Sequence, residues 1–403
     1  MLDLNSIKEA QKRLDGVIHH TSFSYAPILS EMSGYEVYLK KENLQRTGAF
    51  KLRGAFNKIA TLVEEGKMGG VVAASAGNHA QGVAFSAKHF NIEATIIMPE
   101  STPLNKIQGV KEFGANVILH GGNYDEAYEH AMKYTQEHQK EFVHPFTDDE
   151  VMSGQGTVAV EMLETEPNLD AIIVPVGGGG LIAGMGVAIN AINPKVKVIG
   201  VASCGAPAMK ESYDTKNAHG TKSVRTIADG IAVRDASPIT LKHILKEVDA
   251  LELVCEDEIA AAILFLLEKQ KLLVEGAGSV GVAALMHNKI NLPKGSKIGI
   301  VLSGGNIDVT MLSLIIEKGL VKSSRKMKLS VVMIDKPGSL MMFTELLRDV
   351  GANIVHIGYD RTSIELEFGD AVVSVALETK GLEHQDEVRK ILKDNGFEFT
   401  EVR

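Results

Sequence analysis

The sequence predicts an α/β protein whose sheets are open, mostly parallel and covered by helices. Apolar runs of strand length are rich in Val and Ile and are continuous rather than alternating, which is typical of strands buried on both faces. Segments with helical periodicity separate these runs, and this alternation indicates α/β architecture. The predicted strands are residues 71–75, 94–99, 116–120, 171–176, 197–202 and 298–303.

Glycines gather where these predicted strands end. The chain has 39 glycines in 403 residues, and they cluster at Gly77 and Gly82, 177–180, Gly276 and Gly278, and Gly304 and Gly305. Ligands of open α/β sheets bind beyond the carboxyl ends of the strands. Four such exits predict one ligand held by several loops, although at any single exit a glycine also suits a plain tight turn.

Composition excludes several classes of protein. The 42 Lys and Arg residues against 51 Asp and Glu leave a net charge of −9, so no basic surplus exists for nucleic acid or anionic lipid. No apolar run approaches the roughly 18 residues of a membrane span. Cys204 and Cys255 are far apart and form no CxxC, so we expect neither a disulfide framework nor a cysteine-rich metal site. A cytoplasmic location fits these features.

The first residues read as a folded helix rather than as a signal peptide. Ile7, Ala10 and Leu14 recur at helical spacing, and Ser6 with Glu9 has the pattern of a capping box.

The pattern changes after about residue 320. Residues 318–328 contain five basic residues and no acid, so we interpret 321–328 as an exposed linker. Residues 329–403 then follow the order βαββαβ, a ferredoxin-like unit, with strand-like residues at 353–361 and 363–368.

Four segments carry the residues that indicate chemistry. Lys51 stands at the start of a helix, where burial and the helix N-terminus both lower the pKa of an ammonium group. A lysine of lowered pKa is a nucleophile suited to a Schiff base, whereas a lone helix lysine is usually a solvated one.

The second segment is Ser75-Ala76-Gly77-Asn78-His79, between a strand and a helix. Amides at a helix start bind anions such as a carboxylate, with Ser75 and Asn78 as added donors. Taken alone, the segment is equally an ordinary helix cap.

The third is the glycine run Gly177, Gly178, Gly179 and Gly180 with Leu181, which enters a helix and forms a cradle for a phosphate. A dinucleotide site needs an acid at the end of the next strand, and that strand ends in Ser203-Cys204-Gly205. The phosphate therefore belongs to a smaller cofactor, or the run is only a tight turn.

The fourth segment places Ser303 at the end of a strand, where its hydroxyl offers one neutral hydrogen bond. A lysine nucleophile, a carboxylate loop, a phosphate cradle and a polar ring partner together describe a pyridoxal 5'-phosphate site. In order and spacing these segments resemble the tryptophan-synthase-β-like (fold type II) family and, within it, the threonine dehydratases. Residues 226–230 and Glu275-Gly276-Ala277-Gly278 match as well. Residues 329–403 resemble an ACT domain.

The resemblance implies a two-lobed catalytic domain over residues 1–320, with a small lobe at about 45–150, followed by the linker and the ACT domain. It implies that Lys51 binds the cofactor covalently and is the catalytic base, and that Asn78 contacts the ring oxygen. The other implied contacts are Gly177–Gly180 and Leu181 for the phosphate, Ser303 for the ring nitrogen, and Ser75, Asn78 and His79 for the substrate carboxylate.

The implied activity is deamination of threonine to 2-oxobutanoate and ammonia, and of serine to pyruvate. The alternatives are a serine-preferring dehydratase and a serine or threonine racemase. Ala76 stands where serine racemases carry a second serine, which favours a dehydratase. Ala202 and Ala208 replace carboxylates that hold a divalent cation in those relatives, so we predict no metal.

The ACT resemblance implies an amino-acid effector at Asn353 and Ile354, and a homodimer or homotetramer, because such sheets pair edge to edge. The resemblance suggests a place in isoleucine biosynthesis, and the sequence does not distinguish this biosynthetic use from a catabolic one. A rival from another class is a non-catalytic amino-acid sensor, against which the intact Lys51, Asn78 and Ser303 argue.

Overall fold

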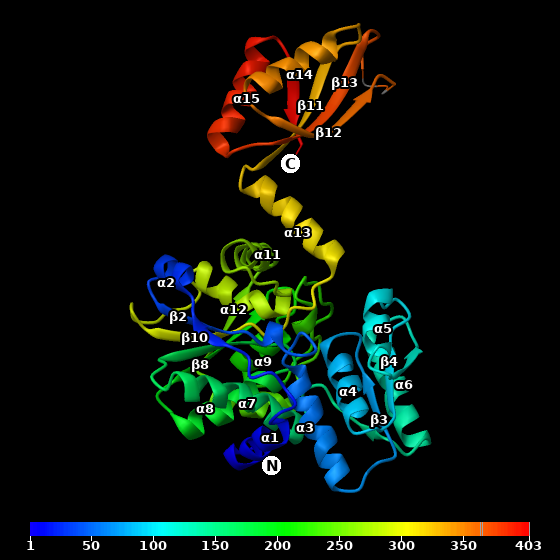
Figure 1. The fold of residues 1–403 in the computed structure, drawn as a ribbon, viewed down its shortest axis with the longest axis vertical. Coiled ribbons are helices and arrows are strands. Elements are labelled where there is room, and N and C mark those ends of the chain that lie inside the picture. The colour runs from blue at the N-terminus through cyan, green and yellow to red at the C-terminus, as the bar shows by residue number, and fades with distance from the viewer. Residues whose placement is uncertain (363, 365, 403) are drawn as a thin grey trace. The chain divides into compact units, whose positions relative to one another are not determined.

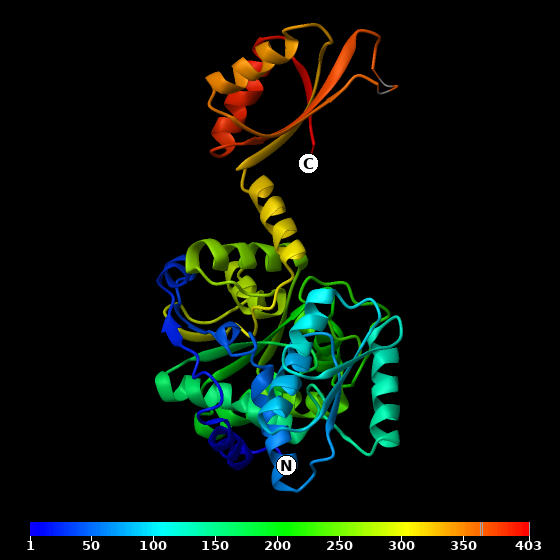
Figure 2. The same cartoon turned by 45° about the vertical axis from the view of Figure 1, so that its right-hand side comes forward.

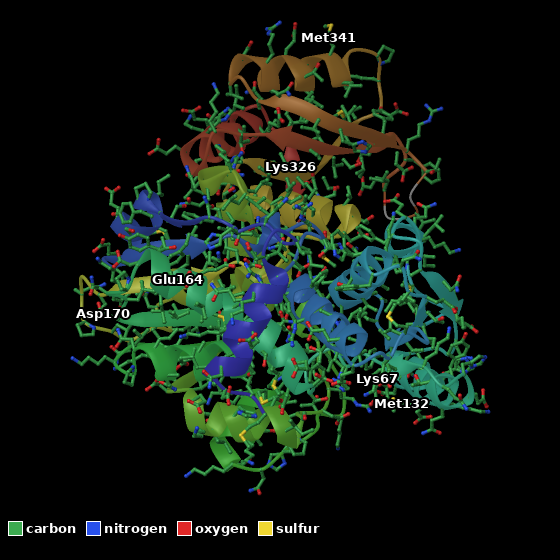
Figure 3. All side chains as sticks on the ribbon, turned by 60° about the horizontal axis from the view of Figure 1, so that its bottom comes forward. Lys67, Met132, Glu164, Asp170, Lys326 and Met341 are labelled. Carbon is green, nitrogen blue, oxygen red and sulfur yellow. A yellow bond between two sulfur atoms is a disulfide. The ribbon has the colours of Figure 1, made fainter. Side chains whose placement is uncertain are left out.

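The computed structural model describes residues 1–362, 364 and 366–402 and divides into two compact units, Met1–Asp308 and Val309–Arg403 (Figure 1). Charged side chains such as Lys67, Glu164 and Asp170 lie exposed on the first unit (Figure 3). Among the described residues, no helix is both long and apolar enough to cross a membrane.

The first unit is built on a six-stranded sheet in the order β1-β2-β10-β7-β8-β9. Only β1 and β2 pair antiparallel, and every other pair is parallel. The strands are β1 (Phe23–Tyr25), β2 (Glu36–Lys40), β7 (Ala171–Pro175), β8 (Lys197–Ser203), β9 (Ala250–Val254) and β10 (Lys297–Val301). The predicted open, mostly parallel sheet is confirmed.

Helices cover both faces of this sheet (Figures 1 and 2). Helix α12 lies on one face, and α7 and α8 lie on the other; the apolar side chains between α7, α8 and the strands form the largest core. These and the accompanying helices are α1 (Leu4–Leu14), α2 (Pro27–Ser33), α7 (Asp149–Thr165), α8 (Gly180–Ile192), α9 (Ala208–Thr215), α10 (Pro238–Glu247), α11 (Glu256–Phe265) and α12 (Gly276–Met286), with short turns η1 (Glu42–Leu44), η2 (Asp229–Ile231) and η3 (Leu266–Gln270).

A second, smaller sheet forms a lobe of the same unit, drawn in light blue and cyan in Figure 1. Its four strands run parallel in the order β5-β4-β3-β6 and have their own apolar core. The elements are α3 (Lys51–Glu64), β3 (Val71–Ala74), α4 (Asn78–His89), β4 (Ala94–Met98), α5 (Leu104–Lys111), β5 (Asn116–Leu119), α6 (Tyr124–Glu137) and β6 (Glu141–Phe142). The sheet lies inside the predicted small lobe of about 45–150.

All six predicted strands are present, with ends that differ by one or two residues. Strands β1, β2, β6 and β9 carried no continuous apolar run. Strand β6 has only two residues, and β9 alternates buried with half-buried positions. Strand β2 ends in Lys40, a charged residue that is fully buried because it pairs with Glu161 at 2.5 Å.

The two cysteines form a disulfide, which the sequence analysis missed. Strands β8 and β9 are parallel neighbours, and their register places Ser203 opposite Val254. The next residues, Cys204 and Cys255, are therefore adjacent although 51 residues separate them in the chain. Sequence distance does not report the spatial distance between the ends of neighbouring strands.

The capping box of α1 differs from the prediction. The N-cap is Asp3, whose Oδ1 accepts from the Ser6 backbone N–H at 2.8 Å, and the Ser6 hydroxyl accepts from the Asp3 N–H at 3.1 Å. Ser6 is thus the third helical residue rather than the cap, and Glu9 pairs with Lys12 instead.

The second unit begins with α13 (Val309–Lys322) and continues in the predicted βαββαβ order. Its antiparallel sheet has the order β12-β13-β11-β14. The elements are β11 (Lys326–Ile334), α14 (Ser339–Asp349), β12 (Asn353–Asp360), β13 (Asp370–Glu378), α15 (Leu382–Asp394) and β14 (Glu398–Glu401).

Two boundaries in this unit differ from the sequence prediction. Helix α13 and strand β11 extend into the predicted linker 321–328, so only residues 323–325 lie between them. The basic side chains are compatible with the end of a helix and the start of a strand as much as with a linker. The predicted strand at 363–368 includes Ser363 and Glu365, which lie outside the described residues, and β12 ends at Asp360.

Candidate active site

Lys51 and Ser303 are brought together by the backbone between them. The Phe50 N–H donates to the Ser303 carbonyl oxygen at 3.1 Å, and Ala49 pairs with Gly304 in an antiparallel bridge. Helix α3 therefore begins beside the end of β10, and Lys51 is its first residue. Two residues that lie 252 positions apart thus share one site, as the sequence predicts for strand exits.

The Lys51 amine is the reactive group of this site. Its Nζ donates to the Pro145 carbonyl oxygen at 2.9 Å. Burial lowers the pKa of Lys51 to about 8, while the Glu275 carboxylate acts in the opposite direction. Burial is one of the two causes that we expected, and the lowered pKa gives a substantial neutral fraction near physiological pH.

Asn78, the first residue of α4, belongs to a hydrogen-bond network between the small lobe and the large sheet. Its Nδ2 donates to the Glu275 Oε1 at 2.7 Å, and its Oδ1 accepts from the Asn306 Nδ2 at 2.8 Å. The Asn306 Nδ2 also donates to the Thr47 carbonyl oxygen at 2.8 Å. An amide nitrogen carries two hydrogens, so Asn78 has a second donor besides the one given to Glu275.

Ser75 and His79 take different positions. The Ser75 Oγ accepts from the Gly77 N–H at 3.2 Å, and its side chain stays partly exposed. The His79 ring is buried, with Nε2 2.8 Å from the Val143 carbonyl oxygen. Burial and the Lys51 charge lower the pKa of His79 to about 3, so the ring is neutral. What His79 offers an anion is its backbone amide in the first turn of α4.

The glycine run lies between β7 and α8 and is tightly packed. Gly179 has φ of +85°, a left-handed conformation that favours glycine. A Cβ on Gly178 would enter the Phe146 ring, and one on Gly177 would lie 2.7 Å from the Ile231 Cα. The Thr240 hydroxyl donates to the Gly178 carbonyl oxygen at 2.8 Å, which fixes the loop from outside. Gly180 and Leu181 open α8, where first-turn amides have no partner within the helix.

Four residues of the site were not assigned a role from the sequence. Glu275 stood within a quoted motif, where an acid before a glycine at a helix start was the signal that could have identified it, and Asn306 directly follows the glycine pair Gly304 and Gly305. Pro145 and Phe146 lie in a loop before α7 and carry no sequence signal, because their role depends on backbone position and ring packing.

The predicted effector residues lie at the start of β12. The Asn353 Nδ2 donates to the Glu378 Oε2 at 2.7 Å, and Ile354 is half-buried. Both line an open pocket of about 440 Å³ together with Thr344, Arg348, Gly351 and Ala352. Neither the cavity nor a ligand for it follows from the sequence pattern alone.

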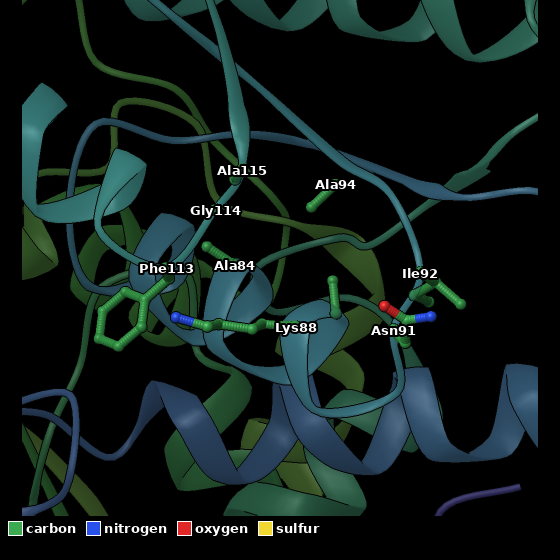
Figure 4. A pocket seen from close by; sticks show the side chains of 9 residues that line it. Ala84, Lys88, Asn91, Ile92, Ala94, Phe113, Gly114 and Ala115 are labelled. Atoms are coloured by element: carbon green, nitrogen blue, oxygen red, sulfur yellow. The ribbon is translucent and has the colours of Figure 1, made fainter.

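A further pocket of about 170 Å³ lies in the small lobe, between the end of α4 and the start of β5 (Figure 4). Its lining is mostly alanine and other apolar residues, and its one charged group, Lys88, donates to the Glu112 carbonyl oxygen at 3.4 Å. None of the predicted site residues lines it.

Comparison with known proteins identifies the family. Residues 14–304 match the family described as pyridoxal-phosphate dependent enzyme. The chain belongs to this family. As a member it is a pyridoxal-phosphate-dependent enzyme, and the fold type II core predicted from its motifs is confirmed.

Relatives with known names extend over the whole chain. The chain is 48% identical over 402 residues to the L-threonine ammonia-lyase of Thermotoga maritima, which covers 100% of both chains. It is 45% identical to the L-threonine ammonia-lyase of Geobacter sulfurreducens, over 98% of each. The catabolic L-threonine dehydratase of Escherichia coli is 39% identical and matches 77% of this chain and 94% of its own length.

Solved structures are similar in fold to more than three quarters of the chain. Maize serine racemase superimposes with a TM-score of 0.74 at 35% identity, over 79% of this chain and 98% of that chain. The processed form of threonine deaminase isoform 2 from Solanum lycopersicum gives a TM-score of 0.73 at 36% identity, over 78% and 86%.

The residues present fit pyridoxal phosphate. A half-buried lysine of lowered pKa suits a covalent bond to the aldehyde, and the packed glycine loop at the start of α8 suits the phosphate. The second Asn78 N–H and the buried Ser303 are neutral polar groups for the ring.

Proposed function

We propose that the chain deaminates L-threonine to 2-oxobutanoate and ammonia, and L-serine to pyruvate. The observation that carries this proposal is the convergence of Lys51, Asn78, the glycine run and Ser303 in one site of a chain 48% identical to an L-threonine ammonia-lyase over its full length. The reaction is balanced: threonine loses water, and hydrolysis of the product releases one 2-oxobutanoate and one ammonia.

Lys51 is the proposed base. Bound pyridoxal phosphate withdraws electrons from the substrate Cα and so acidifies its proton. With a pKa of about 8, Lys51 is partly neutral near pH 7.5 and accepts that proton. The Pro145 carbonyl oxygen, 2.9 Å from Nζ, holds the side chain in one orientation.

Ser303 is the proposed partner of the ring nitrogen. A serine hydroxyl is neutral and does not stabilise a protonated ring as a carboxylate does. A weaker electron sink disfavours transamination and suits elimination of the β-hydroxyl. The first-turn amides of α8 hold the phosphate in this proposal, and Ser75, Asn78 and the His79 amide take the substrate carboxylate.

The alternatives are a serine-preferring dehydratase and a racemase. The similarity to maize serine racemase is the observation that favours the racemase. A racemase needs an acid–base group on each face of the substrate, and the Ala76 side chain offers none on the face opposite Lys51. Purified protein given L-serine should form pyruvate rather than D-serine. Accumulation of D-serine as the main product would favour the racemase.

We further propose that the second unit is an ACT domain that controls activity through a small amino acid bound at Asn353 and Ile354. The open pocket beside both residues supports this, as does the match to the Escherichia coli dehydratase, which covers only 77% of this chain. Isoleucine or valine, products of branched-chain synthesis, are the effectors to test first. A role in isoleucine biosynthesis and a cytoplasmic location stay predictions.

A homodimer or homotetramer is proposed from the edge of the second sheet. Strand β12 ends the described sheet order and exposes Val355, Ile357 and Tyr359. An unpaired apolar edge invites pairing with a second copy. Sedimentation of the purified protein tests this, and a monomer at micromolar concentration would contradict it.

A further inference from the structure

Glu275 is a buried carboxyl group enclosed by the segments of the active site. It is the N-cap residue of α12, and its N–H donates to the Gly304 carbonyl oxygen at 3.0 Å. A Cβ on Gly304 would run into the Glu275 Oε1, and one on Gly230 would lie 3.2 Å from it. Two glycines of the quoted motifs therefore leave the space that this side chain fills.

The Glu275 carboxyl and Asn306 hold the Asn78 amide from opposite sides. Asn306 donates to the Asn78 Oδ1 at 2.8 Å, which fixes the amide so that its NH₂ group faces Glu275 at 2.7 Å. With one hydrogen given to Glu275, the other N–H is the donor that remains for a ligand. The direction of that N–H is therefore set by Glu275 together with Asn306.

The charged groups around Glu275 come from three elements. Lys51 begins α3, Asp229 begins η2, and Lys106 of α5 pairs with Asp229 at 3.1 Å. Burial, the largest cause, and the Asp229 charge raise the pKa of Glu275 to about 7, while the hydrogen bond from Asn78 and the Lys106 charge oppose the rise. Both protonation states of Glu275 are therefore populated near neutral pH.

We propose that Glu275 is a positioning residue that orients Asn78 toward the ring oxygen of the cofactor and makes this contact depend on pH. The ionised carboxylate receives a charge-assisted hydrogen bond from Asn78, which is stronger than the bond to the protonated acid. The Asn78 amide is thus held firmly above the transition and more loosely below it. This inference rests on the proposed role of Asn78 as a cofactor contact.

The test is a pH titration of the visible absorbance of the cofactor-loaded protein. The natural protein should show a spectral step with its midpoint near pH 7. Glu275→Gln keeps an oxygen that accepts from Asn78 but does not titrate, so the step should disappear while the cofactor stays bound. The matched control is Glu258→Gln, which alters a carboxylate that accepts from the Cys255 N–H at the start of α11 and should leave the step intact.

A second variant separates orientation from titration. Asn306→Ala removes the other hold on Asn78, so the cofactor should dissociate up to roughly tenfold faster while the step near pH 7 remains. If Glu275→Gln keeps the step of the natural protein, the inference is overturned. If the natural protein forms no visible band with the cofactor, the proposed site itself fails, and the two failures are thereby distinguished.

Discussion

At the scale of single residues, burial sets the protonation of the active site. Burial disfavours the charged form of both Lys51 and Glu275. It lowers the pKa of Lys51 to about 8 and raises the pKa of Glu275 to about 7. Burial also keeps His79 neutral. The site therefore holds two groups that exchange protons in the physiological range and one histidine that does not.

The first prediction concerns the identity of the lysine. Lys51→Ala should abolish the visible absorbance of the protein with pyridoxal phosphate and reduce threonine turnover by several orders of magnitude, because it removes both the covalent bond and the base. Lys58→Ala, which removes a lysine of the same helix that pairs with Asp148, should keep the absorbance. Retained colour and turnover in Lys51→Ala would refute the assignment.

The second prediction is the pH dependence of cofactor capture. Only the neutral amine attacks an aldehyde, and the neutral fraction of Lys51 rises as pH increases through about 8. The rate at which cofactor-free protein gains its visible band should therefore rise with a midpoint near pH 8 and level off roughly one pH unit above it. Stopped-flow absorbance measures this rate, and a rise that continues past pH 10 would indicate an ordinary exposed lysine.

At the scale of elements, four helices begin at the site. Helices α3, α4 and α8 begin at Lys51, Asn78 and Gly180, and α12 follows the cap residue Glu275. Helices α4 and α8 follow strand exits that the glycine pattern marked, at the ends of β3 and β7. Helices α3 and α12 follow loops, and Gly276 and Gly278, which we expected after a strand, lie inside α12. The location of the site was therefore predictable, because the carboxyl ends of parallel strands share an edge.

The third prediction tests the packed glycine loop. Gly178→Ala places a Cβ in the Phe146 ring, so the loop must shift and the cofactor should bind at least roughly tenfold more weakly. Equilibrium dialysis or fluorescence titration with pyridoxal phosphate measures the Kd. The control is Gly109→Ala in α5, whose Cβ would have only ordinary contacts, and equal losses in both variants would contradict the cradle.

A buried ion network anchors the helix of Lys51. Arg53 forms two hydrogen bonds with Glu42, at 2.8 and 2.9 Å, and contacts Glu161 at 2.6 Å. Lys40 completes the network at 2.5 Å from Glu161. These residues lie on β2, η1, α3 and α7, so the network joins the start of α3 to the large lobe.

The fourth prediction follows from this network. Arg53→Met leaves two buried carboxylates with a single cation, so the free energy of unfolding should fall by about 3–5 kcal/mol. Lys12→Met, which breaks an exposed pair with Glu9, should leave the free energy of unfolding nearly unchanged. Urea denaturation followed by circular dichroism measures both, and similar small losses would show that the network contributes little.

Sequence reasoning missed the residues whose role or burial depends on tertiary contacts. Pro145 and Phe146 act through a carbonyl oxygen and a ring face, which no motif encodes. The disulfide depends on the neighbouring positions of β8 and β9, and the buried Lys40 reads as an exposed residue until its partner Glu161 is placed. The motif did not show that the His79 ring packs inside the lobe, which leaves the predicted contact with the substrate carboxylate to the His79 backbone amide.

At the scale of the whole molecule, the chain combines a catalytic unit with a second unit of its own fold. The family match ends at residue 304, close to the boundary after Asp308. Buried and exposed residues alternate along strands of the second unit such as β11, which is why the βαββαβ order of residues 329–403 could be predicted. The end of helix α13, in contrast, overlaps the basic stretch that we interpreted as a linker.

The fifth prediction concerns control by the second unit. In the full-length chain, Asn353→Ala should weaken the response of threonine turnover to isoleucine or valine and leave turnover without effector unchanged, because Asn353 lines the pocket of about 440 Å³. Met341→Ala changes an exposed side chain of α14 that does not line this pocket and should keep the response. A response equal to that of the natural chain in Asn353→Ala would place the effector elsewhere.

The most direct measurement is product analysis with L-threonine and the purified, cofactor-loaded protein. The proposed function predicts 2-oxobutanoate and ammonia in equal amounts, formed with the loss of threonine and abolished by Lys51→Ala. Absence of 2-oxobutanoate, or recovery of the amino acid mainly as an epimer of threonine, would contradict it.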